Sequence, residues 1–206
     1  HTITMFRCWA SVILALIVTA TYVTSLPGSY AIQRRASKCN GYQDLCNRKY
    51  SNVTHIGAHD SFAVGKLGSL GSNQEANVTV QLEDGIRLLQ IQTHASSGHQ
   101  DSNPSGLSLC HTSCALKNGG TLESYLRQVK QFLDQNKNEI VTLVITNPDN
   151  KPVSNFAKAF ENTGLNSMAY RANSNSISKN DWPTLQELIS QNQRVVVFLD
   201  YKSRKP

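Results

Sequence analysis

Short apolar runs that alternate with helix-like patterns constrain the fold of this chain more than any other feature of its sequence. Apolar residues recur at i, i+3, i+4 and i+7 in residues 122–133, which predicts an amphipathic helix with one buried face. The next run, residues 139–146, is continuously apolar, as in a parallel strand covered on both faces. Further strand-like runs occupy residues 51–58, 86–93, 107–111 and 194–200, and further helical patterns begin near Val78, Val153 and Pro183. Such alternation predicts βαβ units with right-handed crossovers.

The number of strands leaves two α/β architectures open. We expect five strands, the last of which ends shortly before Pro206. One solution is a small open parallel sheet, and the other is the first part of a barrel. The length of 206 residues and the 39% share of hydrophobic residues suit one domain with its own core.

The N-terminal residues have the pattern of a targeting segment. Arg7 precedes an apolar run, residues 8–23, and a small-residue site follows at residues 29–31. The run is shorter than the ~20 residues that span a bilayer comfortably, and it suits the apolar region of a signal peptide. We therefore expect a signal peptide with a short linker in residues 1–35 and the domain in residues 36–206. A retained signal anchor and a buried helix of the domain are the alternatives.

The charge of the domain argues against a nucleic-acid partner. Three of the 20 basic residues, Arg7, Arg34 and Arg35, lie in the first 35 positions, where no acidic residue occurs. The rest of the chain therefore has 17 basic and 14 acidic residues, a net charge of +3 that is spread evenly. This mild, evenly spread charge is not typical of a nucleic-acid-binding surface, but it is compatible with transient contact with an anionic membrane surface. We expect a monomer.

Cysteine spacing favours an exported protein with two local disulfides. The sequence also has N-glycosylation sequons at Asn52 and Asn77, which suit a secreted protein, or an anchored one if the apolar segment is retained. Outside the apolar run there are four cysteines, and among their formal connectivities we favour the local pairs Cys39–Cys46 and Cys110–Cys114.

A metal site is the competing interpretation of the second cysteine pair. Zinc requires four ligands in a defined geometry. Cys110, His111 and Cys114 could supply three of them together with His94 or His99, but no second cysteine pair completes the set. We expect neither a metal nor a cofactor.

Polar side chains follow the predicted strands at the points where the strands end. In a parallel α/β fold these ends meet at one edge of the sheet, where ligands bind. The candidates are His59 and Asp60 after the first strand, Gln90, Gln92 and His94 on the second, His111 after the third, Asn147 after the fourth and Asp200 after the fifth.

Two of these residues suit acid–base chemistry. An unperturbed imidazole pKa near ~6.5 allows one histidine to be neutral while another is protonated, so His59 and His111 could act as general base and general acid on a phosphodiester. The alternative is that both are core histidines bonded to the backbone. Asp60 either orients His59 or caps the following turn, and we expect His55 to be structural.

A combination of motifs carries a resemblance to a known family. The segments are CNGYQDLC, YSNVTHIGAHDS, DGIRLLQIQTH, LCHTSC, GGTLESYLRQVKQFLDQNKNEIVTLVITN, WPTLQELI and RVVVFLDY, within residues 39–202. Together they resemble the phosphatidylinositol-specific phospholipase C X-domain family, or PLC-like phosphodiesterases, and in particular its secreted fungal branch. The resemblance implies a TIM-type (β/α) barrel, of which this chain would hold about five of the eight strands.

The resemblance also implies an activity. It points to a phosphoric diester hydrolase that acts on a phosphoinositide-type or related lipid phosphodiester. By position it makes His59 the general base and His111 the general acid, with Asp60 in the same site. The inositol 2-hydroxyl would displace diacylglycerol and leave a cyclic phosphate.

Three positions depart from the pattern of that family. Gln90 and Gln92 stand where calcium-dependent members hold acidic ligands, and Gln92 stands where metal-independent bacterial members hold a phosphate-binding Arg. The substrate-binding Lys after the fourth strand is replaced near Asn147. Losing one good electrostatic donor costs about 3 kcal/mol of transition-state stabilisation. We expect a metal-independent phosphodiesterase with Gln90, Gln92, Asn147 and Asp200 as substrate contacts, and the alternative is an inactive barrel that binds a glycolipid or glycan.

Overall fold

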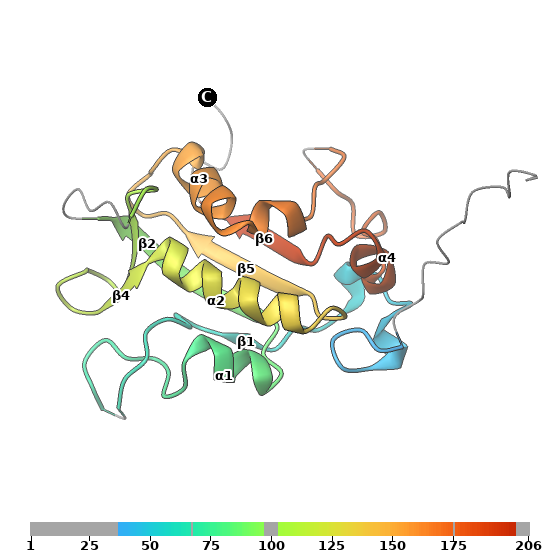
Figure 1. Ribbon diagram of the computed structural model, residues 1–206, viewed down its shortest axis with the longest axis horizontal. Helices are drawn as coiled ribbons and strands as arrows, with labels where there is room; N and C mark the ends of the chain where they lie inside the picture. The colour runs from blue at the N-terminus through green and yellow to red at the C-terminus, as the bar shows by residue number, and fades with distance from the viewer. Residues whose placement is uncertain (1–36, 67, 97–102, 175, 201–206) are drawn as a thin grey trace, which may run out of the picture. The chain divides into compact units, whose positions relative to one another are not determined.

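The structure is a computed structural model that describes residues 37–66, 68–96, 103–174 and 176–200 (Figure 1). The targeting segment expected near the N-terminus lies outside the described residues. Within the described ranges, no helix is both long and apolar enough to cross a bilayer.

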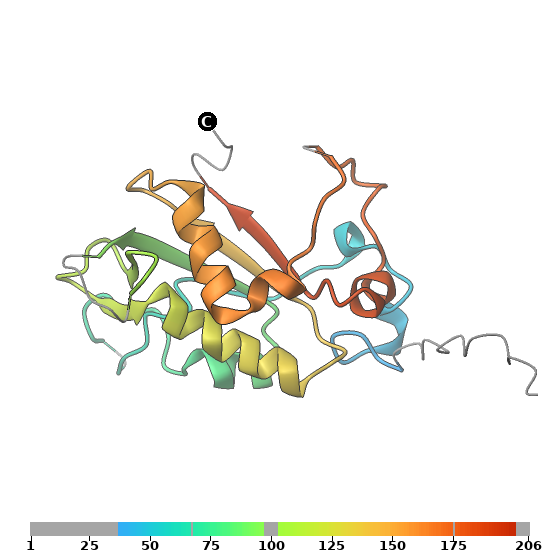
Figure 2. The ribbon, with the colours of Figure 1, turned by 45° about the horizontal axis from the view of Figure 1, so that its top comes forward.

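These residues form a mixed α/β fold in which α1, α2 and α3 lie over one face of a sheet (Figures 1 and 2). The strands are β1 (Gly57–Ala58), β2 (Leu88–Ala95), β3 (Leu107–Cys110), β4 (Asn118–Thr121), β5 (Val141–Thr146) and β6 (Val195–Leu199). The α-helices are α1 (Val78–Glu83), α2 (Leu122–Gln135), α3 (Val153–Thr163) and α4 (Leu185–Ser190), and short 3₁₀ helices are η1 (Gln43–Leu45), η2 (Tyr50–Asn52) and η3 (Leu165–Met168). The strand order is β4-β3-β2-β5-β6, and β1 pairs with β2.

The parallel part of the sheet agrees with the sequence pattern. β1 and β5 pair in parallel with β2, and β6 pairs in parallel with β5; Leu89 lies opposite Leu143, and Leu143 lies opposite Val197. Leu89, Ile91 and Leu143 are fully buried in the core with the helices. Since side chains alternate along a strand, Gln90 and Gln92 point to the opposite face. Helices α1, α2 and α3 therefore pack on the face of Leu89, Ile91 and Leu143. The opposite face carries Gln90 and Gln92, and it also holds a second hydrophobic cluster in which Val196 packs with Leu185 and Leu188 of α4.

The helix predictions are confirmed, because each amphipathic pattern buries its apolar stripe. α2 buries Leu122, Leu126 and Leu133 among others. α3 stops before Gly164, which adopts the left-handed backbone region (φ 74°) that ends many helices. α4 begins after Thr184 rather than with Pro183 in its first turn, and Thr184 forms a capping box with Glu187.

The expectation of a third parallel strand in residues 107–111 is wrong. β3 returns antiparallel along the C-terminal half of β2, with Thr93 opposite Leu109 and Ala95 opposite Leu107. A parallel return requires a long crossover, usually a helix, and the connection between β2 and β3 has no helical apolar pattern. β4 then pairs antiparallel with β3. Its sequence, Asn-Gly-Gly-Thr, has no apolar alternation, so the sequence pattern missed it.

The first strand is also shorter than the predicted residues 51–58. Only Gly57–Ala58 pairs with β2, while Tyr50–Asn52 forms η2. The His55 ring lies 4.9 Å from the Tyr50 ring, centroid to centroid, and Tyr50 shares a hydrogen bond with Thr142. Burial lowers the pKa of His55. His55 therefore packs against Tyr50, in the segment before the first strand.

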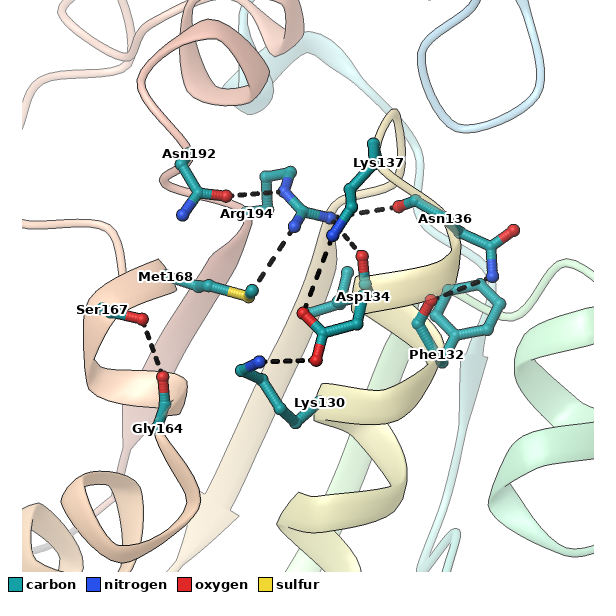
Figure 3. A network of polar contacts seen from close by, with 11 residues as sticks. Lys130, Phe132, Asp134, Asn136, Lys137, Gly164, Ser167, Met168, Asn192 and Arg194 are labelled. Carbon is teal, nitrogen blue, oxygen red and sulfur yellow. Dashed lines mark hydrogen bonds and ion pairs between the residues drawn. The ribbon is translucent and has the colours of Figure 1, made fainter.

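One buried cation ties α2 to β6 (Figure 3). Arg194 is 2% exposed, and its Nη1 donates to the carbonyls of Leu133 and Asn136 at 2.8 and 3.0 Å. Its Nε donates to Asn192, and its Nη2 lies 3.8 Å from the Met168 sulfur. Burial lowers the pKa of Arg194, and the charge of nearby Asp134 opposes that effect. The guanidinium thus satisfies carbonyls that the C-terminal end of a helix leaves free.

Both expected disulfides are present. Cys39–Cys46 lies in the segment that precedes η2, and Cys110–Cys114 closes the turn that follows β3. The sulfurs of Cys110 and Cys114 are bonded to each other, so the zinc interpretation of that pair is wrong. Its other proposed ligand, His99, lies outside the described residues.

Candidate active site

The candidate site forms where β1 and β3 meet along one edge of β2. β1 runs parallel beside Leu88 and Leu89, and β3 runs antiparallel beside residues 93–95. The two strands therefore approach each other head-on, and their C-terminal ends face each other beside Gln90 and Gln92. This topology brings together His59, Asp60 and His111, although β3 does not run in the predicted direction.

A single carboxylate oxygen lies between the two histidines. Asp60 Oδ2 is 3.5 Å from Nε2 of His59 and 3.5 Å from Nε2 of His111. The Asp60 side chain is 3% exposed, whereas those of His59 and His111 are 68% and 27% exposed. The arrangement is an open imidazole and a half-buried imidazole on either side of one buried acid.

The turn after β1 holds Asp60 in this position. Asp60 adopts a left-handed backbone (φ 41°), and its N–H donates to Gln90 Oε1 at 2.8 Å. Burial raises the pKa of Asp60, while the charges of His59 and His111 and the hydrogen bond with Gln90 lower it. Asp60 Oδ1 is buried without a hydrogen-bond partner among the described residues.

His111 is oriented by its second ring nitrogen. Nδ1 lies 2.9 Å from the carbonyl oxygen of Gly71. A carbonyl only accepts, so Nδ1 carries a proton and Nε2 faces Asp60. The distance from Nε2 to Asp60 Oδ2 is 3.5 Å. The arrangement therefore suits a group that delivers a proton from Nε2.

The two glutamines anchor the turns that carry the histidines. Gln90 Oε1 accepts from Asp60 N–H, as described above, and Gln92 Oε1 accepts from Thr112 N–H at 2.9 Å. Thr112 is itself left-handed (φ 62°) and follows His111 directly. In the described part of the chain, neither glutamine NH₂ group donates a hydrogen bond. Both can donate to a ligand without disturbing the turns.

Three further candidates lie elsewhere or are already engaged. Asn147 is fully buried, and both ends of its amide bond the backbone of Lys151, at 2.8 and 2.9 Å, so it braces the turn after β5. Asp200 is exposed at the end of β6, where its N–H donates to the Ile145 carbonyl. Within the described ranges, neither Asn147 nor Asp200 shares a hydrogen bond or ion pair with His59 or His111, whose side-chain partners are Asp60 and Gly71.

The third, His94, pairs with an acid that the sequence did not reveal. His94 Nδ1 lies 3.1 Å from Asp149 Oδ1, and Ala95 N–H donates to Asp149 Oδ2 at 2.7 Å. The hydrogen bond from Ala95 lowers the pKa of Asp149, and His94 adds to the effect. The pair ties the end of β2 to the turn after β5.

Sequence reasoning missed the residues that support the His59–Asp60 turn from behind. Ser61 Oγ shares a 2.5 Å hydrogen bond with the Tyr125 hydroxyl of α2, and Gln81 of α1 donates to the Ser61 carbonyl at 2.9 Å. Burial raises the pKa of Tyr125. The available signal was that Gln81 and Tyr125 are polar residues on the buried stripes of their helices.

The residues present offer no obvious resident metal site. Among the described residues, no group of three or more His, Cys, Asp and Glu side chains is placed to hold an ion. At the positions on β2 that face the histidines, the chain has amides whose oxygens already accept backbone N–H groups.

Comparison with known proteins shows which family the chain belongs to. The family model described as PI-PLC X 1 matches residues 45–206. Two proteins of Arthroderma benhamiae are similar to the chain: one named "Uncharacterized secreted protein", 44% identical over 80% of this chain and 36% of its own length, and one named "PI-PLC X domain-containing protein 1", 41% identical over 92% and 58%. The chain thus spans about a third to about three fifths of these relatives.

A solved structure shares the fold. The phosphatidylinositol-specific phospholipase C from Listeria monocytogenes matches with a TM-score of 0.57 and 19% identity, over 78% of this chain and 56% of its own. The described domain is thus a mixed α/β fold similar to that of a bacterial PI-PLC, with an open sheet. With most of its length matched by the family model, the chain belongs to the PI-PLC X domain family.

Proposed function

We propose that this domain cleaves a phosphodiester by acid–base catalysis, with His59 as general base and His111 as general acid. The observation that carries the proposal is that both imidazoles lie 3.5 Å from one buried oxygen of Asp60. Positioned acids and bases of this kind typically contribute 10²–10⁴-fold to a rate. The family and the name of the Listeria enzyme support a phosphoinositide or a related lipid phosphodiester as substrate.

The reaction divides the work between the two histidines. Open to solvent, His59 removes the proton from a substrate hydroxyl, such as the 2-hydroxyl of inositol. The resulting oxygen attacks phosphorus, and the bond from phosphorus to the leaving oxygen breaks. His111 gives its Nε2 proton to that oxygen, so that diacylglycerol leaves and a cyclic phosphate remains. Asp60 stabilises the positive charge that each ring carries in turn.

The phosphate would meet amide donors rather than a charged group. The NH₂ groups of Gln90 and Gln92 point to the same face of β2 as the site and could donate to the phosphate oxygens. A neutral donor stabilises developing charge less than a cation does. We therefore expect a slow, metal-independent enzyme.

We propose two further features of the whole protein. The open sheet is the N-terminal part of a TIM-type barrel, in keeping with a match to 56% of the Listeria chain. The protein is secreted, in keeping with its two disulfides and with a relative that is named a secreted protein.

Histidine variants test the activity. Pure protein is incubated with phosphatidylinositol, and inositol phosphates are followed by ³¹P NMR. We expect His59→Ala and His111→Ala each to lower kcat by at least about 100-fold, and EDTA to leave the rate unchanged. His55→Phe is the matched control, because it keeps the ring packed against Tyr50 outside the site. Wild-type turnover in either alanine variant would contradict the proposal.

The neutral side chain of Gln92, where a cation would bind phosphate, favours a second candidate function. With Gln92 in place of a cation, the site could bind a glycolipid headgroup without cleaving it. Calorimetric binding of inositol phosphates to the wild-type protein, together with no turnover, would support this alternative. Turnover that His59→Ala removes would exclude it.

A further inference from the structure

The segment that orients His111 is itself held at its base. The Gly71 carbonyl, which accepts from His111 Nδ1 at 2.9 Å, belongs to residues 68–74, which we call the Gly71 segment. The end of this segment returns to the chain that precedes it, where Gly65 N–H donates to the Gln74 carbonyl at 2.9 Å. The position of the carbonyl that faces His111 therefore depends on the backbone around Gly65.

Lys117 joins this backbone to the turn that carries His111. The Lys117 ammonium donates to the carbonyl of Val64, the neighbour of Gly65. The backbone carbonyl of Lys117 accepts from the His111 N–H at 3.1 Å. The Gly71 segment and the turn between β3 and β4 lie at the same end of the sheet (Figures 1 and 2). One residue thus holds the backbone of His111 and, with its other end, the base of the Gly71 segment.

The stem of Lys117 also touches the Gly71 segment directly. Gly71 has a left-handed backbone (φ 72°). A Cβ placed on Gly71 would lie 2.9 Å from Lys117 Cβ, which is closer than two carbon atoms pack. Only glycine allows the backbone to approach the Lys117 stem this closely. The carbonyl that orients His111 therefore lies on backbone that packs against Lys117.

The Lys117 ammonium holds backbone rather than an acid. Lys117 is half-buried, and none of the ion pairs among the described residues includes it. A hydrogen bond from an ammonium is stronger than one between neutral groups. Removing the ammonium while keeping the stem would therefore release the Val64 carbonyl without leaving a carboxylate unpaired.

We propose that Lys117 is a positioning residue for His111, because its ammonium fixes the segment whose Gly71 carbonyl keeps a proton on His111 Nδ1. With Nδ1 engaged in this way, Nε2 is the ring nitrogen that faces Asp60. The orientation of the ring is independent of catalysis, whereas its effect on turnover rests on the proposed function. In that reaction, a ring that rotates or changes tautomer presents the wrong nitrogen to the leaving oxygen.

The tautomer of His111 tests the positioning. The full chain, labelled with ¹⁵N-histidine, is studied by long-range ¹H–¹⁵N NMR at about pH 8, above the ordinary imidazole pKa of ~6.5. We expect the wild type to show His111 with its proton on Nδ1 alone. Lys117→Met keeps the stem and removes the ammonium, and it should give a mixture of both tautomers. Lys117→Arg retains a charged donor and should restore the wild-type signals.

Lys66→Met is the matched control for the lost charge. Lys66 is exposed two positions after Val64, and its replacement should leave the His111 signals unchanged. A pure Nδ1–H tautomer in folded Lys117→Met would overturn the proposal, as would an equal shift in Lys66→Met. If Lys117→Met does not fold, as judged by circular dichroism, Lys117→Gln takes its place with the same expected result.

Kinetics test the effect on turnover. With phosphatidylinositol as substrate, we expect Lys117→Met to lower kcat about tenfold with little change in KM, and Lys117→Arg to recover most of that loss. Wild-type kcat in a Lys117→Met variant whose tautomer has shifted would overturn the catalytic part of the inference. If the wild type hydrolyses nothing while Lys117→Met shifts the tautomer, the positioning stands and the proposed function fails.

Discussion

At the scale of residues, Asp60 is the centre of the candidate site. It is the most buried of the three ionisable groups, and each histidine reaches it from a different strand end. Its left-handed backbone and its bond to Gln90 turn the carboxylate toward His111 as well as toward its neighbour His59. The sequence interpretation, which paired Asp60 with His59 or with a turn, did not include His111 as its partner.

Replacing Asp60 by Asn should separate activity from stability. We expect Asp60→Asn to lower kcat by about 100-fold with little change in KM, because the histidines lose the charge between them. Retained wild-type kcat would contradict this role.

The same variant has a stability signature with a definite sign. Because burial raises the pKa of Asp60 above its ordinary 3.8, the folded state holds the proton more tightly than the unfolded state does. The ionised Asp60 carboxylate therefore lowers the free energy of unfolding, and this destabilisation grows as the pH rises from below 3.8 through the raised pKa. In urea unfolding between about pH 3 and pH 7, Asp60→Asn should gain stability relative to the wild type as the pH rises. A difference that shrinks with rising pH would be inconsistent with this origin.

At the scale of elements, the decisive feature is that β1 and β3 share one edge of β2. β1 runs parallel to β2 and β3 runs antiparallel to it. The C-terminal ends of these two short strands therefore face each other, which brings His59 and His111 together. The C-terminal end of α2 is fixed at a different place, where Arg194 joins it to the first residues of β6 (Figure 3).

Removing the Arg194 guanidinium should destabilise the domain. Arg194→Met keeps much of the side-chain volume but removes the donor to the buried Leu133 carbonyl and to the part-buried Asn136 carbonyl. We expect a loss of about 3 kcal/mol in the free energy of unfolding by urea titration. The control is Lys137→Met, since Lys137 is 67% exposed and its 3.8 Å pair with Asp134 lies at the surface. That change should stay within about 0.5 kcal/mol. Similar losses in both variants would refute a capping role for Arg194.

At the scale of the whole molecule, the two faces of the sheet have different tasks. The helix-covered face holds the main core, and an apolar groove of about 430 Å³ between α3 and β6 lies on that side, lined by Phe156, Phe160, Val197 and Leu199 among others. None of the candidate site residues lines that groove. The site lies instead at the strand ends, next to the turn that the Cys110–Cys114 disulfide closes.

Reduction of the disulfides should weaken the whole domain. The bridges join cysteines separated by 7 and 4 positions, and closing such short loops is worth about 2 kcal/mol each in the chain-entropy model. We expect dithiothreitol to lower the free energy of unfolding by about 2–4 kcal/mol. The variant Cys39→Ser/Cys46→Ser should lose only about half of that amount. Unchanged stability after complete reduction, verified by thiol titration, would contradict this expectation.

The sequence by itself determined the parts of the protein that depend on local pattern. Apolar periodicity placed α2, α3, β5 and β6, and cysteine spacing predicted the two disulfides that the structure contains. It also marked His59, Asp60, Gln90, Gln92 and His111, because polar residues at strand ends stand out against apolar strand bodies.

Only the tertiary structure decided how those residues meet. The direction of β3 depends on hydrogen bonds between segments distant in the chain, and a four-residue strand buried at every position has the same apolar pattern whichever way it runs. The carbonyl that orients His111 belongs to Gly71, whose backbone carries no sequence signal for such a contact. The partners of Asn147 and Asp149 carried no sequence signal either, because a side chain's partners depend on which loops pack together, and that packing is set by the whole fold.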